Sequence, residues 1–237
     1  MKLYDDIINK CLNLLENTNM TTYKKKDISS WDIENEHKII LRSDMAYELG
    51  GMMMPAVSAL AFTSDIDFED EVVVVGDDIS EIKSDTPYAR VTMLKIDDSE
   101  WTDNQKAYSV MQRIDYTRYH VYPKGFMMRI STSTSREPVR ISRQEVDFGL
   151  NFAAVGGTFI DAYHKHKEVK AVKIIFITNK DFPYDKLAQY ASSMEDITKS
   201  LDKIFNNLVM DCRSCNLKPV CDEVEGMREL HKRLEVK

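Results

Sequence analysis

Glu71-Val72-Val73-Val74-Val75-Gly76-Asp77-Asp78 is a strong local signal for regular structure. Four consecutive β-branched residues predict a β-strand, and the glycine and aspartates after them predict the turn that ends it. Other runs rich in β-branched and aromatic residues lie on both sides, so a mixed sheet can form around this strand. The candidate strands and extended segments are residues 37–41, 44–51, 71–75, 88–96, 108–122, 125–130, 139–141 and 169–178.

The helical signals lie at the two ends of the chain and in its second half. One segment begins with Ser142 and Glu145 at capping-box spacing and continues apolar on nearly all sides, which predicts a helix at the buried centre of the fold. Gly156 and Gly157 inside that helix predict a close crossing with a neighbouring element, since glycine otherwise weakens a helix. The predicted helices are residues 3–15, 142–167, 183–210 and 223–237.

These signals together predict an α+β fold. We expect a mixed, mostly antiparallel sheet packed against a central buried helix, with a C-terminal helical cysteine-cluster segment. At 237 residues the chain is long enough to bury a sizeable core. We divide it into an N-terminal helix and connecting loop (1–35), an α+β domain (36–209), and the C-terminal cysteine-cluster segment and helix (210–237).

The charge of the chain limits its partners and location. A formal net charge of −7 argues against nucleic acid, since phosphate backbones attract basic surfaces. No apolar run approaches the ~20 residues of a membrane span, and the acidic, amphipathic start does not resemble a signal peptide. We therefore expect a cytoplasmic protein with no membrane partner. In that reducing compartment, clustered cysteines indicate metal or redox chemistry.

Three of the four cysteines, Cys212, Cys215 and Cys221, fall within ten positions. A Cys-x-x-Cys pair with a third cysteine six residues later can direct three sulfur atoms at one point, as a metal ion or iron–sulfur cluster requires. We expect an iron–sulfur cluster of the [4Fe–4S] type. The alternatives are a structural Zn²⁺ and a redox-active pair formed by Cys212 and Cys215.

Three thiolates leave such a site one ligand short. Cys11 and His231 are the fourth-ligand candidates that we single out; Asp211, Asp222, a second subunit and an open iron that binds substrate are also open. Cys11 has a second interpretation, because it lies on the apolar stripe of the first predicted helix and free cysteines are often buried.

Arginines are concentrated between positions 113 and 143 of this acidic chain. Arginines on adjacent strands can converge to bind phosphate groups through paired hydrogen bonds. The alternative is that they face solvent and pair with surface carboxylates. The candidate phosphate-binding or CoA-binding residues are Arg113, Arg118, Arg129, Arg136, Arg140 and Arg143.

The order of several segments resembles the acetyl-CoA synthase subunit of the CO dehydrogenase/acetyl-CoA synthase complex. The resemblance is carried by Ser43–Gly51, Val72–Glu81, Ile114–Phe126, Val139–Ser142 and the helix, strand and helix that lead to the cysteines, and it covers roughly residues 36–221. It corresponds to the middle domain of that family and the start of its metal-bearing domain. Met127 stands where the family has a tryptophan.

The resemblance implies a role in anaerobic one-carbon and acetyl-CoA metabolism. It places Cys212, Cys215 and Cys221 at cluster-ligand positions, gives the arginines a role in CoA binding, and implies a redox, corrinoid or CO dehydrogenase-type protein partner. The Cys-Gly-Cys element that binds nickel in the family does not occur in this sequence, so nickel is not expected. A family enzyme would be a CO-methylating acetyl-CoA synthase, an acyltransferase, and we do not expect this chain to complete that reaction alone.

Three functions follow as hypotheses. The first is a small iron–sulfur protein that works as an accessory, electron-transfer or CoA-handling module. The second is a non-enzymatic binding module whose fold is stabilised by zinc or an iron–sulfur cluster. The third is an enzyme that uses an open cluster iron as a Lewis acid. The oligomeric state stays open.

Overall fold

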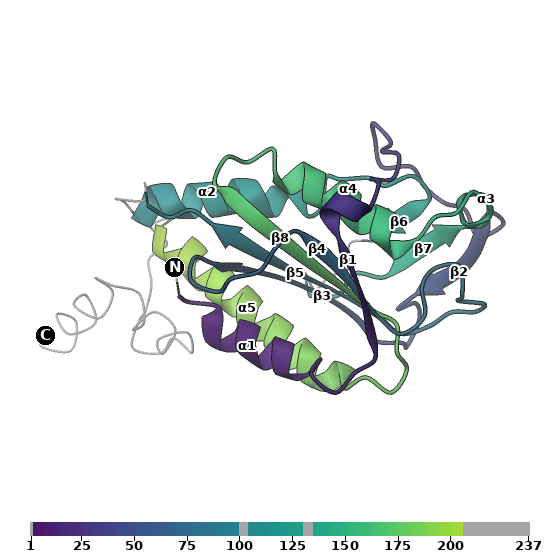
Figure 1. Cartoon of the computed structure of the whole chain (residues 1–237), viewed down its shortest axis with the longest axis horizontal. Helices are drawn as coiled ribbons and strands as arrows, with labels where there is room; N and C mark the ends of the chain where they lie inside the picture. The colour runs from purple at the N-terminus through teal and green to yellow at the C-terminus, as the bar shows by residue number, and fades with distance from the viewer. Residues whose placement is uncertain (1, 100–103, 130–134, 206–237) are drawn as a thin grey trace, which may run out of the picture.

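The valine strand is β4 (Glu71–Val75), and in the computed structural model it lies inside a five-stranded sheet (Figure 1). The structure describes residues 2–99, 104–129 and 135–205. The strand order is β1-β4-β8-β5-β3; the β1–β4 and β8–β5 pairs are antiparallel, whereas β4–β8 and β5–β3 are parallel. The other strands are β1 (Met20–Lys24), β3 (Ala56–Thr63), β5 (Tyr88–Ile96) and β8 (Val169–Ile177).

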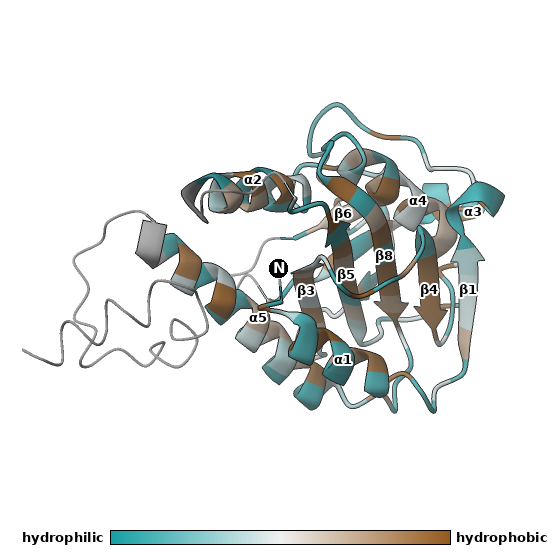
Figure 2. Ribbon diagram, turned by 60° about the vertical axis from the view of Figure 1, so that its left-hand side comes forward, coloured by the Kyte–Doolittle hydropathy of each residue, from teal (hydrophilic) through white to brown (hydrophobic). Residues whose placement is uncertain are grey.

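Helices cover both sides of this main sheet (Figure 2). α4 (Phe152–Tyr163) packs on β4 and β8, with α2 (Asn104–Thr117) beside it. α1 (Asp5–Asn13) and α5 (Tyr184–Phe205) lie on the opposite side, and α5 packs along the edge strand β3. Because side chains on both faces of the sheet are removed from water, β3 and β4 are buried at every position.

A second, three-stranded sheet lies at one end of the molecule (Figure 1). Its order is β2-β7-β6, and both strand pairs are antiparallel. A parallel bridge between Leu49 and Thr86 connects it to the segment before β5. The elements here are β2 (Met45–Leu49), β6 (Phe126–Met128), β7 (Val139–Ser142) and α3 (Arg143–Asp147), and a short 3₁₀ helix, η1 (Lys25–Asp27), follows β1.

The structure confirms the predicted α+β class with a mixed, mostly antiparallel sheet and a buried central helix. Almost every residue of α4 is buried. At Gly156 an added Cβ would lie 2.4 Å from a methyl group of Val72, so glycine permits the close crossing of α4 over β4. The C-terminal cysteine-cluster segment lies outside the described residues.

The strand predicted at 108–122 is wrong, since α2 occupies most of it. Ala107, Val110, Met111 and Ile114 are buried at three- and four-residue spacing, which is the period of an amphipathic helix. Packing of this apolar stripe outweighs the local strand preference of the aromatic residues.

The helix predicted at 142–167 is two helices. Gly149, at φ +96°, follows α3, and the side chain of Asn151 caps α4 by accepting a hydrogen bond from the Ala154 N–H. The side chain of Ser142 makes no capping bond. The strand predicted at 37–41 is also wrong, and part of the predicted loop is β1.

The N-terminal segment belongs to the packed body of the protein. α1 contacts α5, and β1 extends the main sheet by pairing with β4. The division of the chain at residues 35 and 209 stays a prediction. Within the described ranges, no helix is long and apolar enough to span a membrane.

Candidate anion-binding site

The second sheet gathers three of the six predicted arginines, and two of them lie beside one carboxylate, that of Glu48. Arg129 Nη1 lies 2.6 Å from Glu48 Oε1, and Arg140 Nε lies 3.7 Å from the same oxygen. Glu48 stands on β2 opposite Arg140 on β7, and Arg129 directly follows β6. The antiparallel register therefore places both guanidinium groups beside Glu48.

The Arg136 side chain reaches the same end of β2, where it binds backbone carbonyl groups. Its Nη2 donates to the carbonyl oxygens of Gly50, at 3.2 Å, and Met52, at 2.9 Å. Gly50 and Met52 both have positive φ angles, +62° and +50°. A Cβ at Gly51 would come within 2.6 Å of the Glu48 carboxylate, so this glycine lets the turn close over Glu48.

The electrostatics of this arginine cluster (Arg129, Arg136 and Arg140) favour an anion. Glu48 is the carboxylate that contacts the guanidinium groups of Arg129 and Arg140 within the described part of the chain. Asp85 adds one more negative charge nearby, where it accepts a hydrogen bond from the Glu48 N–H at 2.6 Å. Three positive charges against two leave a local surplus in a chain whose net charge is −7. The side chains of Arg129 and Arg140 are 36% and 23% exposed, so a ligand in solution can reach them.

The other three arginines lie elsewhere and have different partners. Arg113, on α2, pairs with Glu168 at 2.7 Å. Arg118 is buried and donates to Ser58 Oγ at 2.7 Å. Arg143 donates to the Met45 carbonyl at 3.4 Å. The structure thus brings Arg129, Arg136 and Arg140 together and separates the remaining three from them.

The predicted metal site falls largely outside the described residues. The residues outside the described part include Cys212, Cys215, Cys221 and His231. Their role as metal ligands stays a prediction. Cys11 is buried on α1, and burial raises the pKa of its thiol to about 12. Because metal ligands are thiolates, this environment favours the interpretation of Cys11 as a core residue. The described residues contain no group of three or more His, Cys, Asp or Glu side chains that could hold a metal ion.

Sequence reasoning missed Glu48, which organises the arginine cluster. The strand that contains it was expected to be extended, but without the pairing of β2 and β7 nothing linked Glu48 to Arg140. It also missed Arg90 and Glu137, which form a buried ion pair. A charged residue inside the run Tyr88–Ile96 was the available signal, since a buried charge requires a partner.

A protein-family comparison now relates this site to known proteins. The family model described as the CO dehydrogenase/acetyl-CoA synthase complex beta subunit matches residues 30–182, more than half of the chain. The chain belongs to this family. Among curated proteins no match was found. All three arginines of the cluster and Glu48 lie inside the matched region of this acetyl-CoA synthase-like protein, and the cysteines at 212–221 follow it. The match confirms the resemblance to the family's middle domain.

Proposed function

We propose that this chain is an iron–sulfur protein that handles coenzyme A within an acetyl-CoA synthase-type complex. The observation that carries the CoA part is the convergence of Arg129 and Arg140 on one carboxylate inside the family-matched region. Because the matched family is described as a subunit of a complex, the proposal includes a CO dehydrogenase-type or corrinoid protein partner.

The arginine cluster would bind the phosphate groups of CoA. Guanidinium groups match phosphate oxygens with paired, charge-assisted hydrogen bonds. In this proposal Arg129 and Arg140 contact the phosphates, and Glu48 holds their guanidinium groups side by side in the absence of ligand. Arg136 is a positioning residue, since it fixes the Gly50–Met52 turn beside them.

Cys212, Cys215 and Cys221 would hold the cluster. Three thiolates fit an iron–sulfur cluster that takes its remaining ligand from elsewhere, and a bound cluster supplies electron transfer. α5 carries the chain from the matched region toward these cysteines. It is fixed to the body by the hydrogen bond between Tyr4 Oη and Thr198 Oγ1, at 3.0 Å, and by the one that the Tyr108 hydroxyl donates to Asp202.

Calorimetric titration tests the CoA part. CoA, dephospho-CoA and pantetheine should bind with decreasing affinity, since they carry progressively fewer phosphate groups. Arg129→Gln and Arg140→Gln should each weaken CoA binding by about tenfold or more, because each removes a charge-assisted contact. Arg113→Gln is the matched control and should leave the affinity unchanged. Equal binding of pantetheine and CoA would overturn this part.

Anaerobic purification tests the cluster part separately. We expect a brown protein that contains iron and acid-labile sulfide and loses both in Cys212→Ser and Cys221→Ala. Cys11→Ala is the control and should keep its iron. A colourless protein with one zinc ion per chain would overturn the iron–sulfur proposal and favour the zinc-stapled binding module.

A further inference from the structure

A cavity of about 170 Å³ lies where α2, β3 and α5 meet, apart from the arginine cluster. Lys199 on α5 lines the cavity and its side chain is 57% exposed, so the cavity is accessible from solvent. The lining residues that bear on ligand binding are Ala59, Leu60, Asp115, Arg118, Ala191 and Met194.

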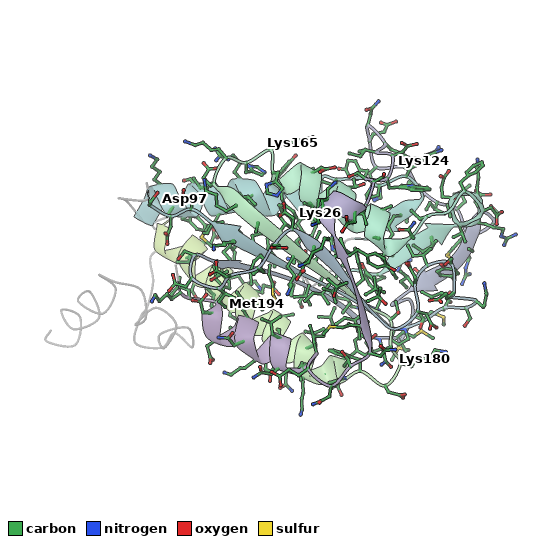
Figure 3. All side chains as sticks on the ribbon, viewed as in Figure 1. Lys26, Asp97, Lys124, Lys165, Lys180 and Met194 are labelled. Atoms are coloured by element: carbon green, nitrogen blue, oxygen red, sulfur yellow. The ribbon has the colours of Figure 1, made fainter. Side chains whose placement is uncertain are left out.

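One part of this cavity is apolar. Ala59 and Leu60 line it from β3, and Ala191 and Met194 line it from α5; all four are buried. Met194 lies where α5 meets the main sheet (Figure 3). Ala59 and Ala191, one small side chain on each wall, leave the space that a short aliphatic group would fill.

Two oppositely charged side chains, Asp115 and Arg118, line the same cavity. Arg118 is held in place, since its Nη2 donates to Ser58 Oγ at 2.7 Å and its guanidinium group lies 5.1 Å from the centre of the Tyr119 ring. Asp115, three residues earlier, has no hydrogen-bond or ion-pair partner for its carboxyl group within the described residues. Burial raises the pKa of Asp115, although the charge of Arg118 opposes the rise. A positively charged hydrogen-bond donor stabilises a desolvated carboxylate of this kind.

We infer that this cavity binds a small zwitterion with a short aliphatic side chain, of the size of alanine or valine. The ligand carboxylate would lie against Arg118, its ammonium group against Asp115, and its aliphatic part against Ala191 and Met194. The volume fits, since cavities of ~150 Å³ hold one benzene-sized molecule. A simple carboxylate would leave Asp115 unpaired, and a phosphate would meet the charges of Asp115 and Glu195.

The full-length protein tests this by calorimetric titration with L-valine and L-alanine. Propionate, which lacks the ammonium group, and isopropylamine, which lacks the carboxylate, are the comparison probes. We expect saturable binding of at least one amino acid, and affinities at least about tenfold lower for both comparison probes, because each loses one charge-assisted contact. No saturable heat with either amino acid would overturn the inference.

Two variants locate the binding. Asp115→Asn keeps the shape of the side chain and should weaken amino-acid binding at least about tenfold, whereas Asp196→Asn, the same change at a position of α5 that does not line the cavity, should not. Ala191→Leu fills the cavity and should abolish the binding while CoA binding is retained. Wild-type affinity in Asp115→Asn would overturn the inference. Since neither variant touches the arginine cluster, failure here leaves the CoA proposal standing.

Discussion

Arg90 Nη2 lies 2.9 Å from Glu137 Oε2, and both side chains are buried. Arg90 stands on β5 in the main sheet, and Glu137 lies just before β7 in the second sheet, so the pair joins the two sheets. The guanidinium group also lies 4.4 Å from the centre of the Phe159 ring and donates to the Arg118 carbonyl at 3.3 Å. Arg90 therefore links both sheets to α4 and to the end of α2.

Glu137→Gln should destabilise the protein by about 3–5 kcal/mol, because it leaves the buried charge of Arg90 without its counter-ion. Urea unfolding followed by circular dichroism measures the loss. Asp6→Asn is the control, since the Asp6–Lys10 pair is exposed to solvent and contributes little to stability. Arg90→Met combined with Glu137→Leu should recover much of the stability. A double variant less stable than Glu137→Gln would contradict the ion-pair explanation.

Gly156→Ala should destabilise the protein by about 1–3 kcal/mol. Alanine favours a helix by about 1 kcal/mol over glycine, but the new Cβ would lie 2.4 Å from Val72 and force α4 off β4. Gly157→Ala is the matched control, since its Cβ would meet Ser30 Oγ at 3.3 Å, and we expect a change of less than about 1 kcal/mol. Val72→Ala should reduce the penalty of Gly156→Ala in a double-mutant cycle.

Local patterns predicted the elements whose signals agree with their packing. The valine strand, the Ile-Ile-Phe-Ile run of β8 and the buried α4 are apolar in the structure as in the sequence. At α2 two signals conflicted, because its aromatic residues favour strands while its apolar positions recur at helical spacing. Contacts of α2 with α4 and α5 favour the helix. Such tertiary contacts cannot be read from a single sequence.

The sequence predicts that arginines form the candidate site, but it does not predict which arginines belong to it. The excess of arginines between 113 and 143 is visible in the sequence, whereas the choice among them depends on strand register. Arg140 and Arg129 reach Glu48 because β7 pairs with both β2 and β6. Arg113 lies on a helix instead, where Glu168 pairs with it. The cavity between Asp115 and Ala191 joins positions far apart in the chain, and no local pattern marks it.

The Cys11 thiol should resist alkylation by iodoacetamide in the native protein. Burial raises its pKa to about 12, so little thiolate is present at neutral or mildly alkaline pH, and the side chain is only 3% exposed. Mass spectrometry of tryptic peptides should show Cys11 labelled only after unfolding in urea. Rapid labelling of Cys11 in the native protein would argue against the core interpretation.

Glu71 should make the stability of the protein depend on pH in the acidic range. It stands on β4 with Lys24 on one neighbouring strand and Lys173 on the other, at 2.6 and 2.8 Å. Burial alone would raise the pKa of Glu71, but its hydrogen bonds and ion pairs with Lys173 and Lys24 outweigh burial and lower the pKa. A lowered carboxyl pKa in the folded state contributes stability above the unfolded pKa of about 4.3, and that stability is lost as pH falls through the folded pKa.

Glu71→Gln should therefore lower the free energy of unfolding at neutral pH by about 1–3 kcal/mol, since it removes a buried charged acceptor from two lysines. The difference between variant and wild type should shrink as pH falls below about 4, because protonation neutralises Glu71 in the wild type. Urea unfolding at neutral pH and in steps down to about pH 3 measures both effects. Glu69→Gln is the matched control, because Glu69 also contacts Lys24 but is 79% exposed, and its effect should stay small at every pH. A constant difference between Glu71→Gln and wild type across this range would mean that packing, rather than the charge of Glu71, accounts for the loss.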